Sequence, residues 1–257
     1  MVESKYITSL GIELEGGISK EGVPKLAAYV SKNRLLDRFQ FGTDGTATAP
    51  KAWQAGLEFR CWDTMDNKLN KLFSLIEYMF NECDYSQGIG CGTHIHMRYA
   101  DLDMAVAIIG TETFNEKFIA DYTHDFKDVN KYINRLNNNY CKPTYVEDNV
   151  LDALNYAFSY KERRINPDNP GRYAAINLRS LNEEQKTVEY RIMPHMDNAK
   201  EMISATEWLC KEVEGLFDDI LNGKLKCGYQ TGDIKLIMPI KRNNVQMTIS
   251  SAKKEDE

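Results

Sequence analysis

The chain has 257 residues, of which 42% are hydrophobic and 27% charged, and its formal net charge is −6. This is the composition of an ordinary globular protein, and the negative charge argues against general nucleic-acid binding, which usually needs a basic surface. The six cysteines form no C-x-x-C pattern, no apolar run reaches transmembrane length, and "MVESKYITSL" has no signal-peptide core. We therefore expect a cytoplasmic protein with reduced thiols that binds neither nucleic acid nor membrane.

Hydrophobic periodicity predicts alternating strands and helices in the first part of the chain. The predicted elements are a strand over Tyr6–Gly16, a helix over about Pro24–Asp37, a turn-rich loop at 41–50 and a strand in "GLEFRCW" from Gly56. A helix then follows Asp63 or Thr64 and continues to Phe80, and "GIGCGTHIHMRYA" predicts a further strand.

The second part begins with a mostly helical region, from about Asp101 to Arg163, which is interrupted where Pro143 blocks a helix. A strand pair follows, in "RYAAINLRS" and "TVEYRIM", and a long helix covers about 198–221. We expect a single catalytic domain over 1–249 with room for a mostly helical insertion at about 101–165, and a flexible tail over 250–257.

Four predicted strands carry ionisable side chains on one face and apolar side chains on the other, because alternate strand residues point in opposite directions. The ionisable pairs are Glu13 and Glu15, Glu58 and Arg60, His94 and His96, and Glu189 and Arg191. Each pair alone is compatible with a wet strand face or a cross-strand ion pair. Together they predict one sheet whose apolar face is covered by helices and whose other face gathers the charged groups.

Carboxylates gathered in this way need cations, because side-by-side carboxylates repel each other and are costly to bury unpaired. Oxygen-rich sites with few nitrogen ligands favour magnesium or manganese over zinc. Divalent ions beside arginines match phosphoryl chemistry, in which both stabilise charge on the transferring group. The pattern therefore predicts metal ions between the glutamates.

The motifs "GIELEGG", "TDGT", "GLEFRCW", "CGTHIHM", "GRYAAINL" and "TVEYR" resemble those of the amidoligase family, in family order, over about residues 7–195. This family groups with carboxylate–amine ligases related to glutamine synthetase and glutamate–cysteine ligase. The resemblance implies a glutamine-synthetase-like α+β fold with a curved, mainly antiparallel sheet. It also implies ATP-dependent amide formation, in which an amine attacks an acyl phosphate and ADP and phosphate leave.

The resemblance further implies two or more Mg²⁺ or Mn²⁺ ions. Glu13, His94 and Glu189 would hold the ion on the ATP phosphates. Glu15 and Glu58 would hold an ion nearer the acceptor carboxylate, and the remaining ligand of that second ion is left open.

Further roles follow from the same resemblance. His96 would lie near the nucleotide phosphates, and Arg172 and Arg191 would contact the γ-phosphate as it transfers. Asp44 would orient a metal ion or the incoming amine. Asp44 and Glu58 are both candidates for the base that deprotonates the amine, and the sequence does not select between them.

Two other functions fit these residues. A zinc hydrolase would use His94 and His96 as ligands, with His195 near enough in the chain to join them. A non-catalytic relative would bind nucleotide without turnover. The sequence specifies neither the oligomeric state nor the two substrates, a carboxylate and an amine drawn from amino acids, peptides or protein side chains.

Overall fold

The computed structural model describes residues 4–43, 47, 49–137, 141, 174–182 and 186–225. Its strands form an open, six-stranded sheet in the order β2-β3-β1-β4-β6-β5, and every neighbouring pair is antiparallel. The strands are β1 (Ile7–Ser19), β2 (Phe39–Gly42), β3 (Gln54–Thr64), β4 (Thr93–Tyr99), β5 (Ile176–Asn177) and β6 (Val188–Met193). The predicted α+β class and antiparallel sheet are confirmed.

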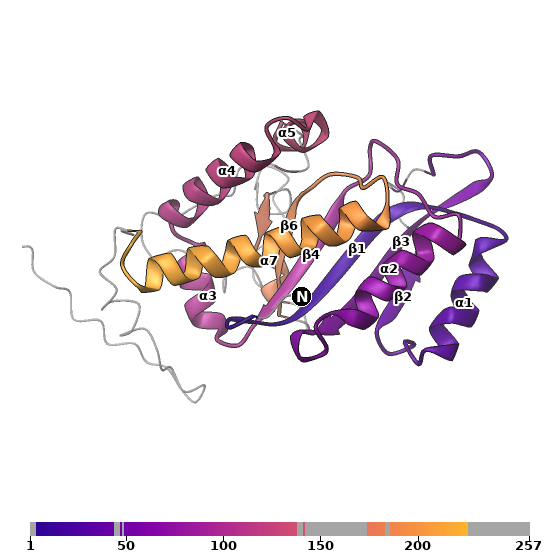
Figure 1. Ribbon diagram of the computed structural model, residues 1–257, viewed down its shortest axis with the longest axis horizontal. Coiled ribbons are helices and arrows are strands. Elements are labelled where there is room, and N and C mark those ends of the chain that lie inside the picture. Colours follow the sequence, from indigo (N-terminus) through magenta and orange to yellow (C-terminus); the bar gives the residue numbers. More distant parts are fainter. Residues whose placement is uncertain are drawn as a thin grey trace, which may run out of the picture.

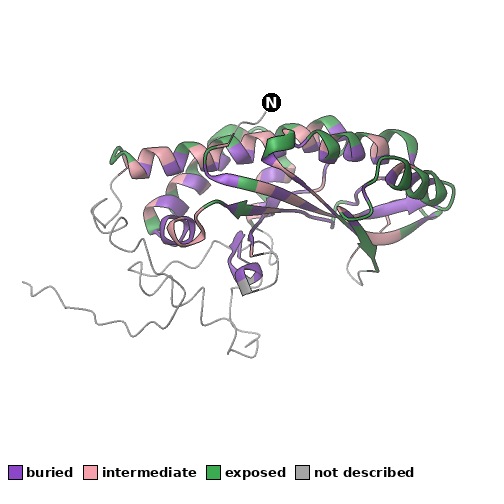
Figure 2. Cartoon of the chain, turned by 90° about the horizontal axis from the view of Figure 1, so that it is seen from below, coloured by how far each residue is buried: buried purple, intermediate pink, exposed green. Residues whose placement is uncertain are grey.

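The described helices are α1 (Gly22–Lys32), α2 (Asn70–Glu82), α3 (Leu102–Ile109), α4 (Glu112–Phe126), α5 (Asn130–Leu136) and α7 (Ala199–Leu221). Helices α1, α2 and α7 lie along one face of the sheet, as the alternating pattern predicted (Figure 1, Figure 2). None of these described helices combines the length and the apolar character needed to cross a bilayer.

The core lies between the helices and the apolar sheet face. Ile12 and Leu14 of β1 are both buried, as are Phe59 of β3 and Ile95 of β4. Phe217 of α7 packs on this face. The rings of Phe217 and Tyr99 stack with centroids 5.4 Å apart, and the Tyr99 hydroxyl lies 2.7 Å from that of Tyr190. Burial of one face leaves the opposite side chains of the same strands to form the site.

The first predicted helix is too long, and the loop that follows it contains part of a strand. Helix α1 ends at Lys32 because Arg34 takes a left-handed conformation, with φ 55°, and Leu35 N–H donates back to the Val30 carbonyl at 2.9 Å. This turn allows Phe39–Gly42 to pair with β3 as an edge strand. Periodicity alone carried the prediction past a turn that has no glycine or proline to signal it.

The second predicted helix begins later than expected. Met65–Asn67 form a 3₁₀ turn, Lys68 and Leu69 have φ of 51° and 55°, and the α-helix begins at Asn70. Buried Asp63 stabilises this entry, because its carboxylate accepts hydrogen bonds from the Thr64 N–H at 2.9 Å and the Lys71 N–H at 3.2 Å.

The other predicted element boundaries agree only partly with the structure. The first strand extends beyond its predicted end to Ser19, whereas β5 covers two residues of its predicted strand and Arg179–Asn182 form a 3₁₀ turn. The long C-terminal helix is confirmed. The predicted helical region is confirmed as far as Leu136 through α3, α4 and α5, while its remainder around Pro143 and the tail from Ser250 lie outside the described residues.

Candidate active site

The charged side chains of four strands meet on the face opposite the helices. Glu13 lies in the middle of this face, with Arg60 of β3 on one side of it and His94 of β4 on the other. Glu15 is paired with Glu58 across β1 and β3, and His96 is paired with Glu189 across β4 and β6. Pairing register therefore brings together residues that are more than 170 positions apart in the sequence.

Glu13, His94 and Glu189 form a group in which one potential ligand atom from each residue lies within 4.8 Å of the others. His94 Nδ1 is 3.4 Å from Glu13 Oε2 and 3.3 Å from Glu189 Oε1. Within the described part of the chain, Glu13, His94 and Glu189 are the sole group of three such metal-ligand donors. Two carboxylates and one imidazole suit a divalent ion of the magnesium or manganese type.

Two arginines lie against this group. Arg60 Nε is 3.0 Å from Glu13 Oε1, and its Nη2 is 2.7 Å from Glu58 Oε1. Arg191 Nη1 is 2.5 Å from Glu189 Oε1. These guanidinium groups offset the repulsion between the carboxylates and also offer donors that suit phosphate oxygens.

The environment keeps Glu13 ionised. Burial, the largest single influence, would raise the pKa of Glu13, but hydrogen bonds and charge interactions with His94 and His96 together lower that pKa below its usual range. His96 Nε2 lies 3.4 Å from Glu13 Oε1, and its Nδ1 lies 3.1 Å from the Thr187 hydroxyl. An ionised carboxylate at the centre of the face is suited to holding a cation.

Glu15 and Glu58, the residues of the second predicted metal group, are neighbours but have no third carboxylate or imidazole within the same short range among the described residues. Glu15 Oε2 accepts a hydrogen bond from the Gly92 N–H at 3.1 Å. Glu58 is held by Arg60. The predicted residues Asp44 and Arg172 lie outside the described residues.

The two other histidines do not join the group. His195 Nε2 lies 3.9 Å from Asp197 Oδ1, and burial lowers the pKa of His195. His124 is exposed on α4 beside Asp125. Within the described chain, the donors around His94 are therefore carboxylates and not further histidines.

Sequence reasoning missed several groups that support the site. Asn177 Nδ2 donates to Glu189 Oε2 at 2.6 Å, and Thr187 contacts His96 as described above. Asn177 lies within "GRYAAINL", so the motif carried a signal for its position but not for its role. Arg60 was expected on the charged face, but its contact with Glu13 was not, although Arg60 has the same spacing from Glu58 as Arg191 has from Glu189.

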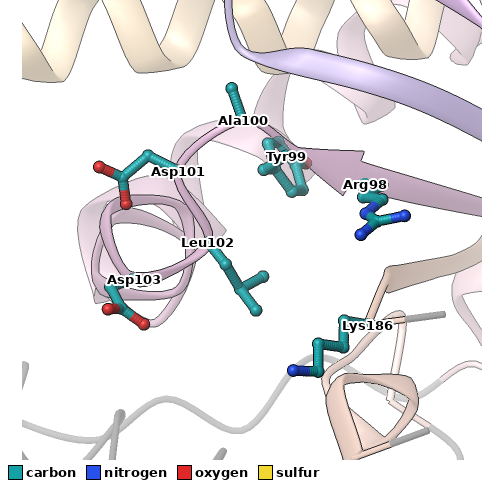
Figure 3. A pocket seen from close by; sticks show the side chains of 7 residues that line it. All are labelled: Arg98, Tyr99, Ala100, Asp101, Leu102, Asp103 and Lys186. Atoms are coloured by element: carbon teal, nitrogen blue, oxygen red, sulfur yellow. The ribbon is translucent and has the colours of Figure 1, made fainter. Parts of the chain in front are cut away.

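A pocket of about 290 Å³ lies at the C-terminal end of β4, where it is lined by Arg98, two residues after His96. Figure 3 shows Arg98, Leu102 and Lys186 around this space, where β4 passes into α3. Arg98 shares the charged strand face with His94 and His96, and Lys186 immediately precedes Thr187. Asp101 and Asp103 line the pocket as well, so its two cations lie beside two carboxylates, and one of the cations belongs to the strand residue that follows His96 and Met97.

Comparison with known proteins places the chain in a family. A family model described as "Putative amidoligase enzyme" matches residues 63–213, more than half of the chain. The matched segment contains His94, Glu189 and Arg191, and β1 with Glu13 and Glu15 precedes it. No curated protein matches the chain. With the family model and the grouped carboxylates, histidines and arginines in agreement with the motifs, the chain belongs to the amidoligase family.

Proposed function

We propose that this protein is an ATP-dependent carboxylate–amine ligase with a glutamine-synthetase-like curved sheet. Membership of the amidoligase family supports a ligase. The observation that carries the proposal is the group formed by Glu13, His94 and Glu189, with Arg191 in contact with Glu189. Metal-ligand donors next to a guanidinium match the needs of phosphoryl transfer.

The chemistry explains why a phosphate must take part. A carboxylate is a poor electrophile, because its leaving group would be oxide. In the first step, a carboxylate oxygen of the acceptor bonds to the γ-phosphorus, and the bond from that phosphorus to the ADP oxygen breaks. In the second step, the amine nitrogen bonds to the carbonyl carbon, phosphate leaves, and a base takes a proton from the nitrogen.

Glu13, His94 and Glu189 would hold a divalent ion, Mg²⁺ or Mn²⁺, and Glu15 and Glu58 would hold a second one together with a further ligand. Bound ions would supply positive charge where two anions have to meet. Arg191 would bind the γ-phosphate through its planar fork of donors, and Arg172 would assist it. His96 would lie beside the nucleotide phosphates.

The proton from the amine requires a base near the acceptor. Glu58 is a candidate because it is paired with Glu15 in the sheet, at the end of the site away from the pocket. Asp44 is the other candidate. Both remain part of the proposal.

The pocket beside His96 supports a direction for the nucleotide. Arg98 and Lys186 offer donors for phosphate oxygens, while Asp101 and Asp103 on the α3 side of the same pocket of about 290 Å³ could accept from ribose hydroxyls. We infer that ATP extends from this pocket toward Glu13. The acceptor and the amine, from an amino acid, a peptide or a protein side chain, would then approach from the Glu15 end in the cytoplasm.

The proposal is tested by incubating the protein with ATP, magnesium and fractionated cell extract, followed by mass spectrometry. The expected result is a product lighter than its two reactants by one water, together with ADP and phosphate. Amide formation with AMP and pyrophosphate would show adenylation instead and would contradict the acyl-phosphate route.

A further inference from the structure

Arg135 on α5 is 6% exposed, so its charge is almost entirely removed from water. Its Nε donates to the Arg191 carbonyl at 3.0 Å. Among the residues that the structure describes, none places a carboxylate within ion-pair distance of its guanidinium. Burial lowers the pKa of Arg135, and repulsion by Arg191 adds to this effect, whereas charge interactions with Cys141 and Glu15 act in the opposite direction. Glu15 attracts this cation from beyond ion-pair distance, and a buried cation whose charge is only partly balanced costs free energy, so an anion bound directly to the guanidinium would stabilise it.

The position of the guanidinium follows from Gly92. This glycine directly precedes β4, which begins at Thr93, and lies two residues before His94. A Cβ placed on Gly92 would lie 2.3 Å from Arg135 Nη2, far inside van der Waals contact. The guanidinium therefore occupies the space that any side chain at position 92 would fill, directly before β4.

Glu15 lies at the same end of the site. The Gly92 N–H donates to Glu15 Oε2 at 3.1 Å, so a single residue contacts both Glu15 and the Arg135 guanidinium. The triple group of Glu13, His94 and Glu189 already has Arg60 and Arg191 against it. Arg135 is a further cation, placed toward the end opposite Arg98 and Lys186.

We propose that Arg135 binds a carboxylate of the acceptor substrate. This inference rests on the proposed function, which makes the acceptor a carboxylate and places it at the Glu15 end. A guanidinium presents two parallel donors that match the two oxygens of a carboxylate, whereas a lysine presents a point charge. Binding of the acceptor would supply the counter-ion that the described residues do not provide.

Replacement of Arg135 should weaken ligand binding without lowering the stability of the unliganded protein. If Arg135 serves a ligand, the unliganded protein bears the cost of a buried charge, as functional sites often do. Arg135→Met should then melt at the same temperature as the wild type or above it when no ligand is present. Gly92→Ala gives an independent route, because the added methyl group displaces the guanidinium without removing its charge.

The experiment measures thermal unfolding of wild type, Arg135→Met, Arg135→Lys and Gly92→Ala, with Arg34→Met as the matched control at an exposed arginine. Each protein is titrated with glutarate and, separately, with inorganic phosphate, at constant ionic strength. Wild type and Arg34→Met should be stabilised by glutarate. Arg135→Met and Gly92→Ala should need about tenfold more glutarate or lose the effect, and Arg135→Lys should fall between.

A parallel titration with magnesium and a non-hydrolysable ATP analogue keeps the two proposals apart. Arg135→Met should retain the nucleotide-induced shift, because Arg135 serves the acceptor. Absence of that shift in the wild type would contradict the ligase proposal and leave the glutarate result to decide the role of Arg135. The inference is overturned if glutarate does not stabilise the wild type, if it stabilises Arg135→Met equally, or if the phosphate response alone depends on Arg135.

Discussion

Arg191 Nη1 lies 2.5 Å from Glu189 Oε1 and 3.5 Å from His94 Nδ1, so one guanidinium contacts two of the three grouped donors. Any ion that binds this group will compete with Arg191 for the same lone pairs. Arg191 would then be released, in part, to contact a phosphate oxygen. The charges within the group are therefore already partly balanced before any ligand arrives, and the ligand changes which partners balance them.

This arrangement predicts the effect of Arg191→Lys. Lysine keeps the charge but loses the planar fork of donors, so turnover should fall by about 10²-fold or more, the scale of losing one charge-stabilising donor. The measurement is kcat together with the melting temperature, and Arg34→Lys at an exposed position is the control. Near-normal turnover in a folded Arg191→Lys protein would remove Arg191 from the reaction.

Asn177 should act through Glu189. Its Nδ2 donates to Glu189 Oε2 at 2.6 Å, which fixes the carboxylate while Oε1 faces His94. Loss of an outer hydrogen-bond partner of a metal ligand typically weakens metal affinity about 10–100-fold. We expect Asn177→Ala to weaken binding of magnesium with a non-hydrolysable ATP analogue by this amount in calorimetry. Unchanged affinity would mean that Asn177 does not orient the carboxylate.

Asp63 provides a contrast, since it is a fully buried carboxylate with a structural role. It accepts hydrogen bonds from Arg38 and from the Thr64 and Lys71 N–H groups. Asp63→Ala leaves these donors without their acceptor and should destabilise the protein by about 3 kcal/mol in denaturant unfolding. Magnesium should not alter this loss. A loss below about 1 kcal/mol would show that the carboxylate does not stabilise the entry to α2.

Glu212 on α7 predicts a pH-dependent contribution to stability. Burial, followed by a hydrogen bond with Asp121, raises the pKa of Glu212 from 4.5 to about 7. Because the folded state holds this proton more tightly than the unfolded state, the contribution is fully present below pH 4.5 and is lost as the pH rises through about 7.

Glu212→Gln removes the titrating group and should raise the melting temperature relative to the wild type at pH 8. At pH 4.5 this difference should be much smaller, since Glu212 is then protonated in the folded protein. Thermal unfolding of both proteins across this range is the measurement. A difference that does not vary with pH would contradict the raised pKa.

The sequence predicted the charged sheet face well, because strand period and residue type are both local properties. Glu13, His94 and Glu189 meet as their shared strand faces required. The supporting arginine could not be found in the same way. Arg135 lies on a short helix with no motif, and its importance comes from burial and from the contact with Gly92, which are tertiary properties.

The end of α1 and the start of α2 were predicted wrongly for a different reason. The turns after α1 and before α2 place Arg34, Lys68 and Leu69 at positive φ, where glycine or asparagine is the usual signal. Before α2, hydrogen bonds from the Thr64 and Lys71 N–H groups to buried Asp63 stabilise the turn against the local preference of Lys68 and Leu69. The apolar periodicity in both regions continues through the turns, so it could not mark them.

The central claim is that Glu13, His94 and Glu189 bind the divalent ion that accompanies the nucleotide. The most direct test is calorimetric titration of a non-hydrolysable ATP analogue, with magnesium, into wild type, Glu13→Gln and Glu189→Gln. Glu77→Gln, at an exposed position on α2, is the control. We predict that the wild type and Glu77→Gln bind the analogue with equal affinity. Each site variant should bind it more than about 100-fold more weakly, a larger loss than the one expected for Asn177→Ala, which removes only a hydrogen-bond partner of a ligand. Equal affinity in all four proteins would contradict the claim.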